Sequence, residues 1–186
     1  QGVAAALDVP LERIEVRQGD TAAIGSGGGT GGSSSTIISV TTIHAATEKL
    51  VARIKALAGH LLEAAPQDIA LRAGGAEIAG TDRRLSLSEL AVSAQGGAIP
   101  PERRGTLAGQ AKFADQIASF PSGVIVAEAE VDAETGGVAI DRLVSMQDVG
   151  TVINAQLVDG QMQGGIAQCL GQALIETCTY DRASAQ

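Results

Sequence analysis

Hydrophobic residues recur along this chain with two periods, one typical of helices and one typical of strands. The longest helical pattern runs from about Ser39 to Ala65, with apolar side chains every three or four positions on one core-facing stripe. The stripe consists of Val40, Ile43, Leu50, Ile54, Leu57 and Leu61. Thr36 or Ser39 is suited to cap the start of this helix, and Pro66 follows its end.

Alternation of polar and apolar residues predicts strands in the first half of the chain. Arg13–Arg17 alternates in this way, as a half-buried strand does. The short runs Ile69–Leu71 and Ala76–Ile78 flank Ala73-Gly74-Gly75, which predicts a tight hairpin. Downstream, Ser86 and Glu89 have the spacing of a capping box for a short helix over Leu87–Ala94.

The second half contains the strongest hairpin signal of the chain. Val124–Val131 and Val138–Val149 read as two long strands joined by the turn-forming segment Asp132–Gly137. A second long helix is predicted over Gln156–Thr177. Glycines interrupt it at positions 160, 164, 165 and 171, each at a cost of roughly 1 kcal/mol relative to alanine. We therefore expect a backbone or a ligand to come close to this helix.

These elements predict an α+β fold of two layers, with helices packed on mixed β-sheets and two similar, intertwined halves. The first half, residues 1–94, contains a glycine-rich loop and the long helix. Residues 95–121 form a crossing loop rich in glycine, proline and charge. The second half, residues 122–186, contains the hairpin and the glycine-interrupted helix.

The composition excludes some classes of function. The chain has 186 residues, enough for a core, and this core must be aliphatic because 45% of residues are hydrophobic but only 2% are aromatic. A net charge of −8 provides no basic patch for nucleic acid. No run of about 18 apolar residues exists, so we expect no membrane span.

The segment Gly25–Thr36 contains only glycine and hydroxyl-bearing residues and leads into the long helix. Such a loop gives close access to backbone N–H groups at the positive end of a helix dipole, which suits an anion such as phosphate. A flexible Gly/Ser linker is the alternative. The dinucleotide-binding and nucleotide-hydrolase loop motifs both fail, because the acidic residue Glu48 falls inside the helix and the first lysine is Lys49.

Conventional catalytic or metal-ligating clusters are not predicted. His44 and His60 lie too far apart along one helix to share a metal ion. The carboxylates of the hairpin alternate along its strands, so they form a solvated face and tip rather than a converging pair. They are Glu128, Glu130, Asp132 and Glu134.

Several ordered motifs resemble the molybdopterin-binding large subunit of the xanthine dehydrogenase, aldehyde oxidase and carbon monoxide dehydrogenase family. In the first half they are Gly19-Asp20-Thr21, Gly29–Thr36 and Leu61–Ala64. In the second half they are Phe120–Gly123, Glu130–Gly136, Asp148–Asn154 and Gly160–Gln168. The resemblance covers nearly the whole chain, which begins at Gln1 and reads as a piece of a longer subunit.

The resemblance implies two groups of cofactor-binding residues and no catalytic or metal-ligating residue, since the family's glutamate base lies beyond the chain. Gly32, Ser33, Ser34 and Ser35 would meet the phosphate or dinucleotide part of the cofactor. Gln161, and secondly Gln168, would meet the pterin, although both glutamines could instead satisfy local backbone groups. Ser34 replaces the family's usual arginine, and Cys169 replaces its usual glycine, either crowding a close approach or forming a plain buried thiol.

The resemblance further implies the reaction and its partners. The parent enzyme would hydroxylate an aldehyde or N-heterocycle with oxygen from water. Its cofactor would be molybdopterin or its cytosine dinucleotide form, with iron–sulfur clusters and FAD carried on other domains or subunits. We expect the rest of the large subunit as a partner and a cytoplasmic location, with the periplasm as the alternative. Two rival hypotheses are a cofactor-free structural or assembly module and an independent nucleotide-binding domain.

Overall fold

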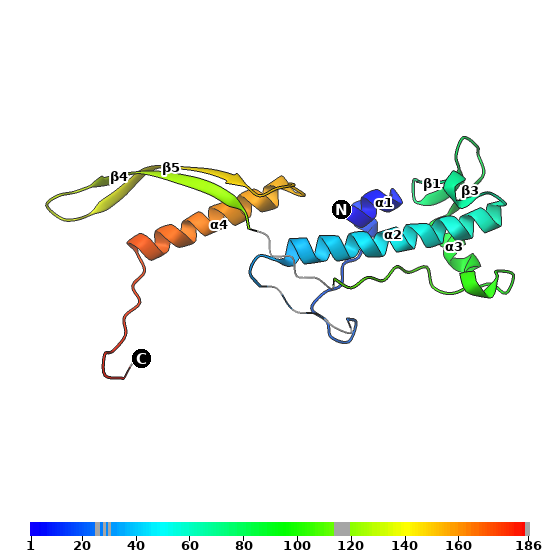
Figure 1. Ribbon diagram of the computed structural model, residues 1–186, viewed down its shortest axis with the longest axis horizontal. Coiled ribbons are helices and arrows are strands. Elements are labelled where there is room, and N and C mark those ends of the chain that lie inside the picture. Colours follow the sequence, from blue (N-terminus) through cyan, green and yellow to red (C-terminus); the bar gives the residue numbers. More distant parts are fainter. Residues whose placement is uncertain (25–26, 28, 30, 114–119, 185–186) are drawn as a thin grey trace. The chain divides into compact units, whose positions relative to one another are not determined.

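The computed structural model of the chain (Figure 1) describes residues 1–24, 27, 29, 31–113 and 120–184. These residues fall into two compact units, Gln1–Gln116 and Ile117–Gln186. Helices combine with small sheets in both, which confirms the α+β class. The predicted mixed pairing is not seen: every strand pair among the described residues is antiparallel. Each pair is joined by a short turn, and such turns allow only antiparallel neighbours.

The first unit is built around the helix α2. Its elements are α1 (Gly2–Leu7), the 3₁₀ turn η1 (Leu11–Arg13), α2 (Ser35–Leu62), η2 (Pro66–Asp68), β1 (Ile69–Arg72), β2 (Gly75–Ile78), β3 (Arg84–Ser86), α3 (Leu87–Ser93) and η3 (Pro101–Arg103). The strands form a sheet in the order β1-β2-β3. One core cluster joins α1, α2, the sheet and α3 through Leu7, Ile54, Leu57, Ala58, Leu62, Ile69, Ala76, Leu90, Ala94 and Ile99.

Helix α2 begins earlier than the pattern predicts. Its first residue is Ser35 and its N-cap is Ser34, so Thr36 and Ser39 lie inside the helix and the prediction that one of them is the cap is wrong. The core covers only the C-terminal half of the predicted stripe. Val40 and Ile43 remain 40% and 45% exposed, whereas Ile54 is 2% exposed. The helix therefore extends its N-terminal turns beyond the core of this unit.

The hairpin of β1 and β2 is confirmed, with Ala73 and Gly74 at its turn. Both have positive φ, 46° and 68°, as a two-residue type I′ turn requires. The short third strand, β3, was not predicted. The strand predicted over Arg13–Arg17 is wrong: Arg13 ends a 3₁₀ turn, Ile14 is half-buried, and residues 15–17 are exposed and belong to no strand.

An extended segment, residues 104–110, runs beside α2 (Figure 1). Arg53 donates from Nη2 to the carbonyl oxygen of Arg104 at 2.7 Å, and Lys49 donates from Nζ to that of Gln110 at 3.0 Å. Gly109 packs so closely on α2 that a Cβ there would overlap the carbonyl oxygen of Ala46. Two long cationic side chains and one glycine thus fix this segment on the helix.

The second unit contains the predicted hairpin, formed by β4 (Ser122–Val131) and β5 (Val138–Asp148), and the helix α4 (Ala155–Leu174). At the turn, Asp132 accepts hydrogen bonds through Oδ1 from the amides of Glu134 and Thr135. Hydrogen bonds from Thr135 and from the Glu134 amide lower the pKa of Asp132. Helix α4 ends at Leu174, three residues before its predicted end at Thr177, and the Asn154 side chain caps its start by accepting from the Leu157 amide.

Replacing Gly109 with alanine tests the contact between the extended segment and α2. The new methyl group would have to displace the Ala46 carbonyl, so Gly109→Ala should lower the free energy of unfolding by about 1–3 kcal/mol in urea denaturation. Gly97→Ala is the matched control, because a Cβ at Gly97 meets nothing within 4 Å. An equal effect of the two substitutions would contradict the packing described.

The capping box of α3 makes stability depend on pH. Glu89 accepts from the amide and the hydroxyl of Ser86, and these hydrogen bonds, the amide first, lower its pKa. A carboxylate with a lowered folded-state pKa stabilises the fold above its ordinary pKa, and this contribution is lost as the pH falls through the folded value. In Glu89→Gln, the free energy of unfolding should therefore fall less between neutral and acidic pH than in the unchanged chain, as measured by urea denaturation at each pH. An unchanged pH dependence would exclude this contribution.

Candidate functional site

The start of α2 has an unusual backbone. Gly32 and Ser33 both have positive φ, 57° and 55°, and Ser34 then returns to the right-handed helical region. Left-handed φ is rare for a residue other than glycine and marks a position held by its surroundings or by function. Consecutive residues of opposite hand turn their N–H groups toward a common point, which suits an anion. Gly25, Ser26, Gly28 and Thr30 of the predicted loop lie outside the described residues.

The first turn of α2 keeps its hydrogen-bond donors available. Ser34 occupies the N-cap position, but its side chain makes no capping hydrogen bond; its hydroxyl donates back to the carbonyl oxygen of Gly31 at 2.7 Å. No hydrogen bond among the described residues uses the amides of Ser35, Thr36 or Ile37. These donors stand at the positive end of a 28-residue helix. We call Gly32–Ile37 the α2 start.

Helix α4 has two contrasting faces. Val158, Met162, Ile166 and Leu170, spaced by four, are half-buried. The opposite side is exposed and consists of Leu157, Gly160, Gln161, Gly164 and Gln168, which we call the glycine–glutamine face. Gln161 and Gln168 are seven residues apart, about two turns, and so project from the same side. A Cβ added at Gly160, Gly164 or Gly165 meets nothing within 4 Å, so a flat group has room to lie on the backbone.

The structure therefore gathers the predicted residues into two groups. Gly32, Ser33, Ser34 and Ser35 share one turn in the first unit, and Gln161 with Gln168 share one helix face in the second. Cys169, expected either to crowd a close approach or to be a plain buried thiol, is exposed.

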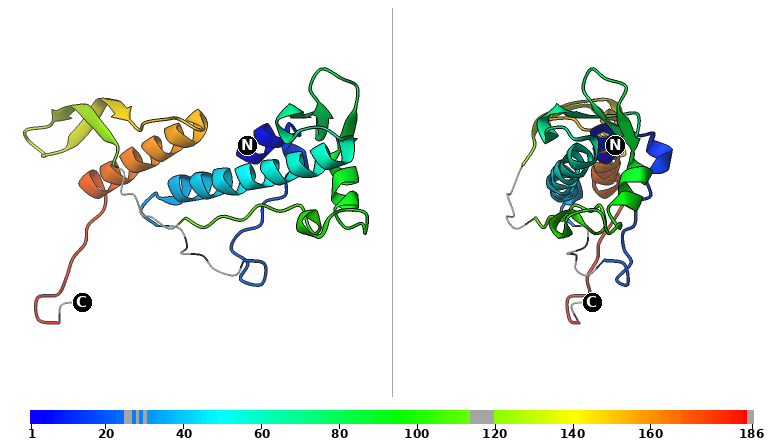
Figure 2. Two further views of the ribbon diagram at one scale, coloured as in Figure 1. Left: turned by 45° about the vertical axis from the view of Figure 1, so that its right-hand side comes forward. Right: turned by 90° about the vertical axis from the view of Figure 1, so that its right-hand side faces the viewer.

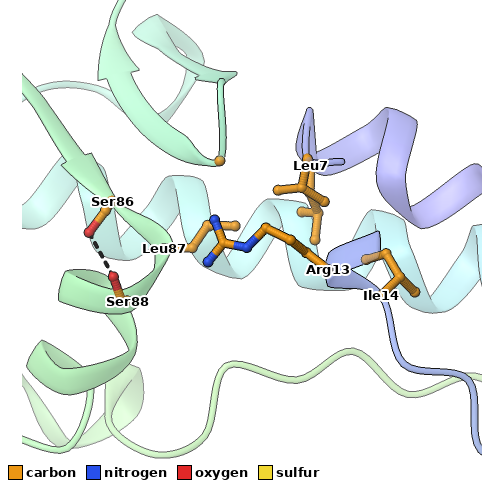
Figure 3. A pocket seen from close by; sticks show the side chains of 8 residues that line it. Leu7, Arg13, Ile14, Ser86, Leu87 and Ser88 are labelled. Carbon is orange, nitrogen blue, oxygen red and sulfur yellow. Dashed lines mark hydrogen bonds between the residues drawn. The ribbon is translucent and has the colours of Figure 1, made fainter. Parts of the chain in front are cut away.

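One cavity of about 210 Å³ in the first unit was not predicted (Figure 3). It is lined by Leu7, Val9, Arg13, Ile14, Gly74, Ser86, Leu87 and Ser88. None of the six predicted site residues lines it. Its volume is below that of typical sites for drug-sized ligands, so a pterin cofactor would not fit. No sequence pattern marked it, because its walls come from four separate segments.

Other polar groups form exposed pairs rather than a catalytic cluster. His44 Nε2 lies 3.5 Å from Glu48 Oε1, and Arg142 Nε lies 3.8 Å from Glu128 Oε2. Within the described ranges, no three His, Cys, Asp or Glu residues lie where they could hold a metal ion. No helix in the same ranges has the length and apolar character to cross a membrane.

Relatives of known activity share nearly the whole chain. The chain is 32% identical over 182 residues to the 6-hydroxypseudooxynicotine dehydrogenase complex subunit gamma of Paenarthrobacter nicotinovorans, covering 97% of this chain and 23% of the relative. It is 27% identical to the carbon monoxide dehydrogenase large chain of Hydrogenophaga pseudoflava, covering 97% of this chain and 22% of the relative. The chain thus spans less than a quarter of the length of these relatives.

Solved structures share the fold. The crystal structure of the Cu,Mo-containing carbon monoxide dehydrogenase matches with a TM-score of 0.83 and 25% identity, over 97% of this chain and 23% of that chain. Quinoline 2-oxidoreductase from Pseudomonas putida 86 matches with a TM-score of 0.64 and 34% identity, over 77% of this chain and 19% of that chain.

A family model described as a molybdopterin cofactor-binding domain matches residues 1–186. This match covers every motif that carried the resemblance in the sequence, and the structures and relatives above agree with it. The chain belongs to the family of molybdopterin cofactor-binding domains.

Proposed function

We propose that this chain binds the molybdenum cofactor through the α2 start and the glycine–glutamine face of α4, as part of the large subunit of a molybdenum hydroxylase. The observation that carries the proposal is the α2 start. Three first-turn amides without an acceptor among the described residues follow two left-handed residues, Gly32 and Ser33. This donor set suits a phosphate, which the cofactor contains in both its short and its dinucleotide form.

The α2 start would hold the phosphate end of the cofactor by neutral donors. The amides of Ser35, Thr36 and Ile37 and the hydroxyls of Ser33 and Ser35 would donate hydrogen bonds to it without adding charge. Ser34 supplies no cation, in contrast to the arginine usual in the family. Binding would therefore depend on the backbone geometry and the helix dipole, and the dinucleotide form would add contacts elsewhere.

The glycine–glutamine face would hold the pterin end. A glutamine amide both donates and accepts, which matches the mixed donors and acceptors on a pterin edge. Gly160 and Gly164 expose backbone on the same face and leave space for a planar ring. Gln161 is the first candidate for this contact and Gln168, two turns later, the second.

The cofactor, when bound, supplies the two-electron oxidation chemistry. We propose that the whole enzyme hydroxylates an aldehyde or N-heterocycle with oxygen from water and passes electrons to iron–sulfur clusters and FAD on other domains or subunits. Relatives named as dehydrogenases or hydroxylases of nicotine derivatives and carbon monoxide support an oxidoreductase. The chain's own residues would bind and orient the cofactor, and we assign none of them to proton transfer. The location we propose is cytoplasmic.

Gln161→Ala tests the pterin contact. In the large subunit that contains this chain, the loss of a hydrogen bond from a desolvated site should weaken cofactor retention by about tenfold. The measurement is molybdenum and pterin content after dialysis against cofactor-free buffer. Gln163→Ala is the matched control, because Gln163 is exposed on a different face of the same helix. Equal retention by the two variants would exclude Gln161 as a contact.

Gly32→Ala tests the phosphate contact. Gly32 and Gly31 both have open space around a Cβ, but only Gly32 has positive φ. Alanine at position 32 is strained, so the backbone should shift and the first-turn donors should move out of alignment. We expect Gly32→Ala to lower cofactor retention and Gly31→Ala to preserve it, measured by the same molybdenum and pterin analysis. Full retention in Gly32→Ala would show that this turn does not hold the phosphate.

A further inference from the structure

The pairing register of the β4–β5 hairpin determines which side chains share a face. Cross-strand partners point to the same side, and Val124 pairs with Met146, Val126 with Val144, and Glu128 with Arg142. These pairs are two residues apart along each strand, so all three lie on one face. The first two pairs form an apolar surface, which we call the open-end patch (Val124, Val126, Val144 and Met146).

The open-end patch is uncovered in the structure. Val124 and Val126 are each 57% exposed, Val144 is 54% exposed and Met146 is 73% exposed. The opposite face is partly covered, along β5 only. Its β5 residues Ile140, Leu143, Ser145 and Gln147 are half-buried, whereas Ile125 of β4 is 50% exposed. Helix α4 runs along one side of the hairpin (Figures 1 and 2), and its half-buried residues suit packing on this β5 side. The open-end patch, in contrast, is exposed on both strands.

The hairpin is charged toward its tip and apolar toward its open end, and the charged residues mark the border of the patch. The Glu128–Arg142 ion pair borders it on the same face, and the tip beyond is acidic, with Glu130, Asp132 and Glu134. At the opposite, open end further apolar side chains are exposed: Phe120, Val152 and Ile153. A contiguous apolar surface with a charged border is typical of an interaction site rather than of a solvated strand pair.

The second unit has no fully buried side chain. No residue among 120–184 is buried. A two-stranded hairpin relies on packing against further layers, and α4 lies along only one side of this one. The open-end patch is the apolar surface that a second layer would bury.

We propose that the open-end patch docks against an apolar layer of the remaining large-subunit polypeptide. The length of a related chain indicates which polypeptide covers the patch. The carbon monoxide dehydrogenase chain contains this fold, over 97% of the present chain, as only 23% of its own length. In that protein the fold is therefore accompanied by more than three times as much polypeptide. This inference rests on the proposal that the chain works within a large subunit, but it requires no cofactor.

Thiol labelling of Val126→Cys, in a Cys169→Ser and Cys178→Ser background, tests the surface. A maleimide should label Cys at position 126 rapidly in the isolated chain. When the chain replaces the matching segment of the 6-hydroxypseudooxynicotine dehydrogenase subunit gamma, labelling should slow by about tenfold or more, because the thiol becomes buried. The control is Glu134→Cys at the tip, which should label at similar rates in both proteins.

Three results would overturn the proposal. One is slow labelling at position 126 in the isolated chain at low concentration, which would mean that the chain covers its own patch. Another is a labelling rate at position 126 that falls only when the chain dimerises, with dimerisation followed by light scattering. That result would make the partner a second copy of the chain. The third is equally fast labelling in the chimera. If the chimera does not fold, a lysine placed in the relative's subunit at the position that aligns with Val126 tests the same surface, and an unchanged subunit yield would then overturn the proposal. Molybdenum content, measured in parallel, separates failure of docking from failure of cofactor binding.

Discussion

The burial of the C-terminal half of α2 is the constraint on which the first unit depends. Ile54, Leu57 and Leu62 lie in the core against the sheet and α3, and Arg53 and Lys49 fix the extended segment on the same half of the helix. Because this half is anchored, the N-terminal half is carried beyond the core with its first-turn amides available. A helix held at one end can thus present the donors and the dipole of its other end to a ligand.

In the second unit, α4 likewise has one side that is half-buried and another that stays exposed. The half-buried residues of α4 that are spaced by four are apolar, whereas the glycine–glutamine face is exposed. Four glycines in a helix cost stability, and nothing within the described residues packs on Gly160, Gly164 or Gly165. Their presence is understandable if a planar group or another backbone approaches this side. Under the proposed function, binding of the cofactor would offset the cost of an exposed, glycine-rich helix.

Local signals predicted local structure well. The capping box of Ser86 and Glu89 and the turn at Asp132–Gly137 depend on residues close in sequence, and both were found. The start of α2 was misplaced because a glycine–serine segment without a side-chain cap gives no pattern to read. Arg13–Arg17 alternates like a strand but has no neighbour to pair with, which only the tertiary structure reveals. The shared face of Gln161 and Gln168 could be predicted from their spacing in the sequence. The uncovered face of the hairpin could not, because it depends on the pairing register of the two strands.

We propose that the α2 start and the glycine–glutamine face of α4 each contribute contacts to a molybdenum cofactor. The most direct measurement is the molybdenum and pterin content of the large subunit containing this chain, purified with its partner subunits and compared with the amount of protein. We expect equal molar amounts of molybdenum, pterin and chain. A folded, assembled complex without metal and pterin would contradict it and favour a structural module.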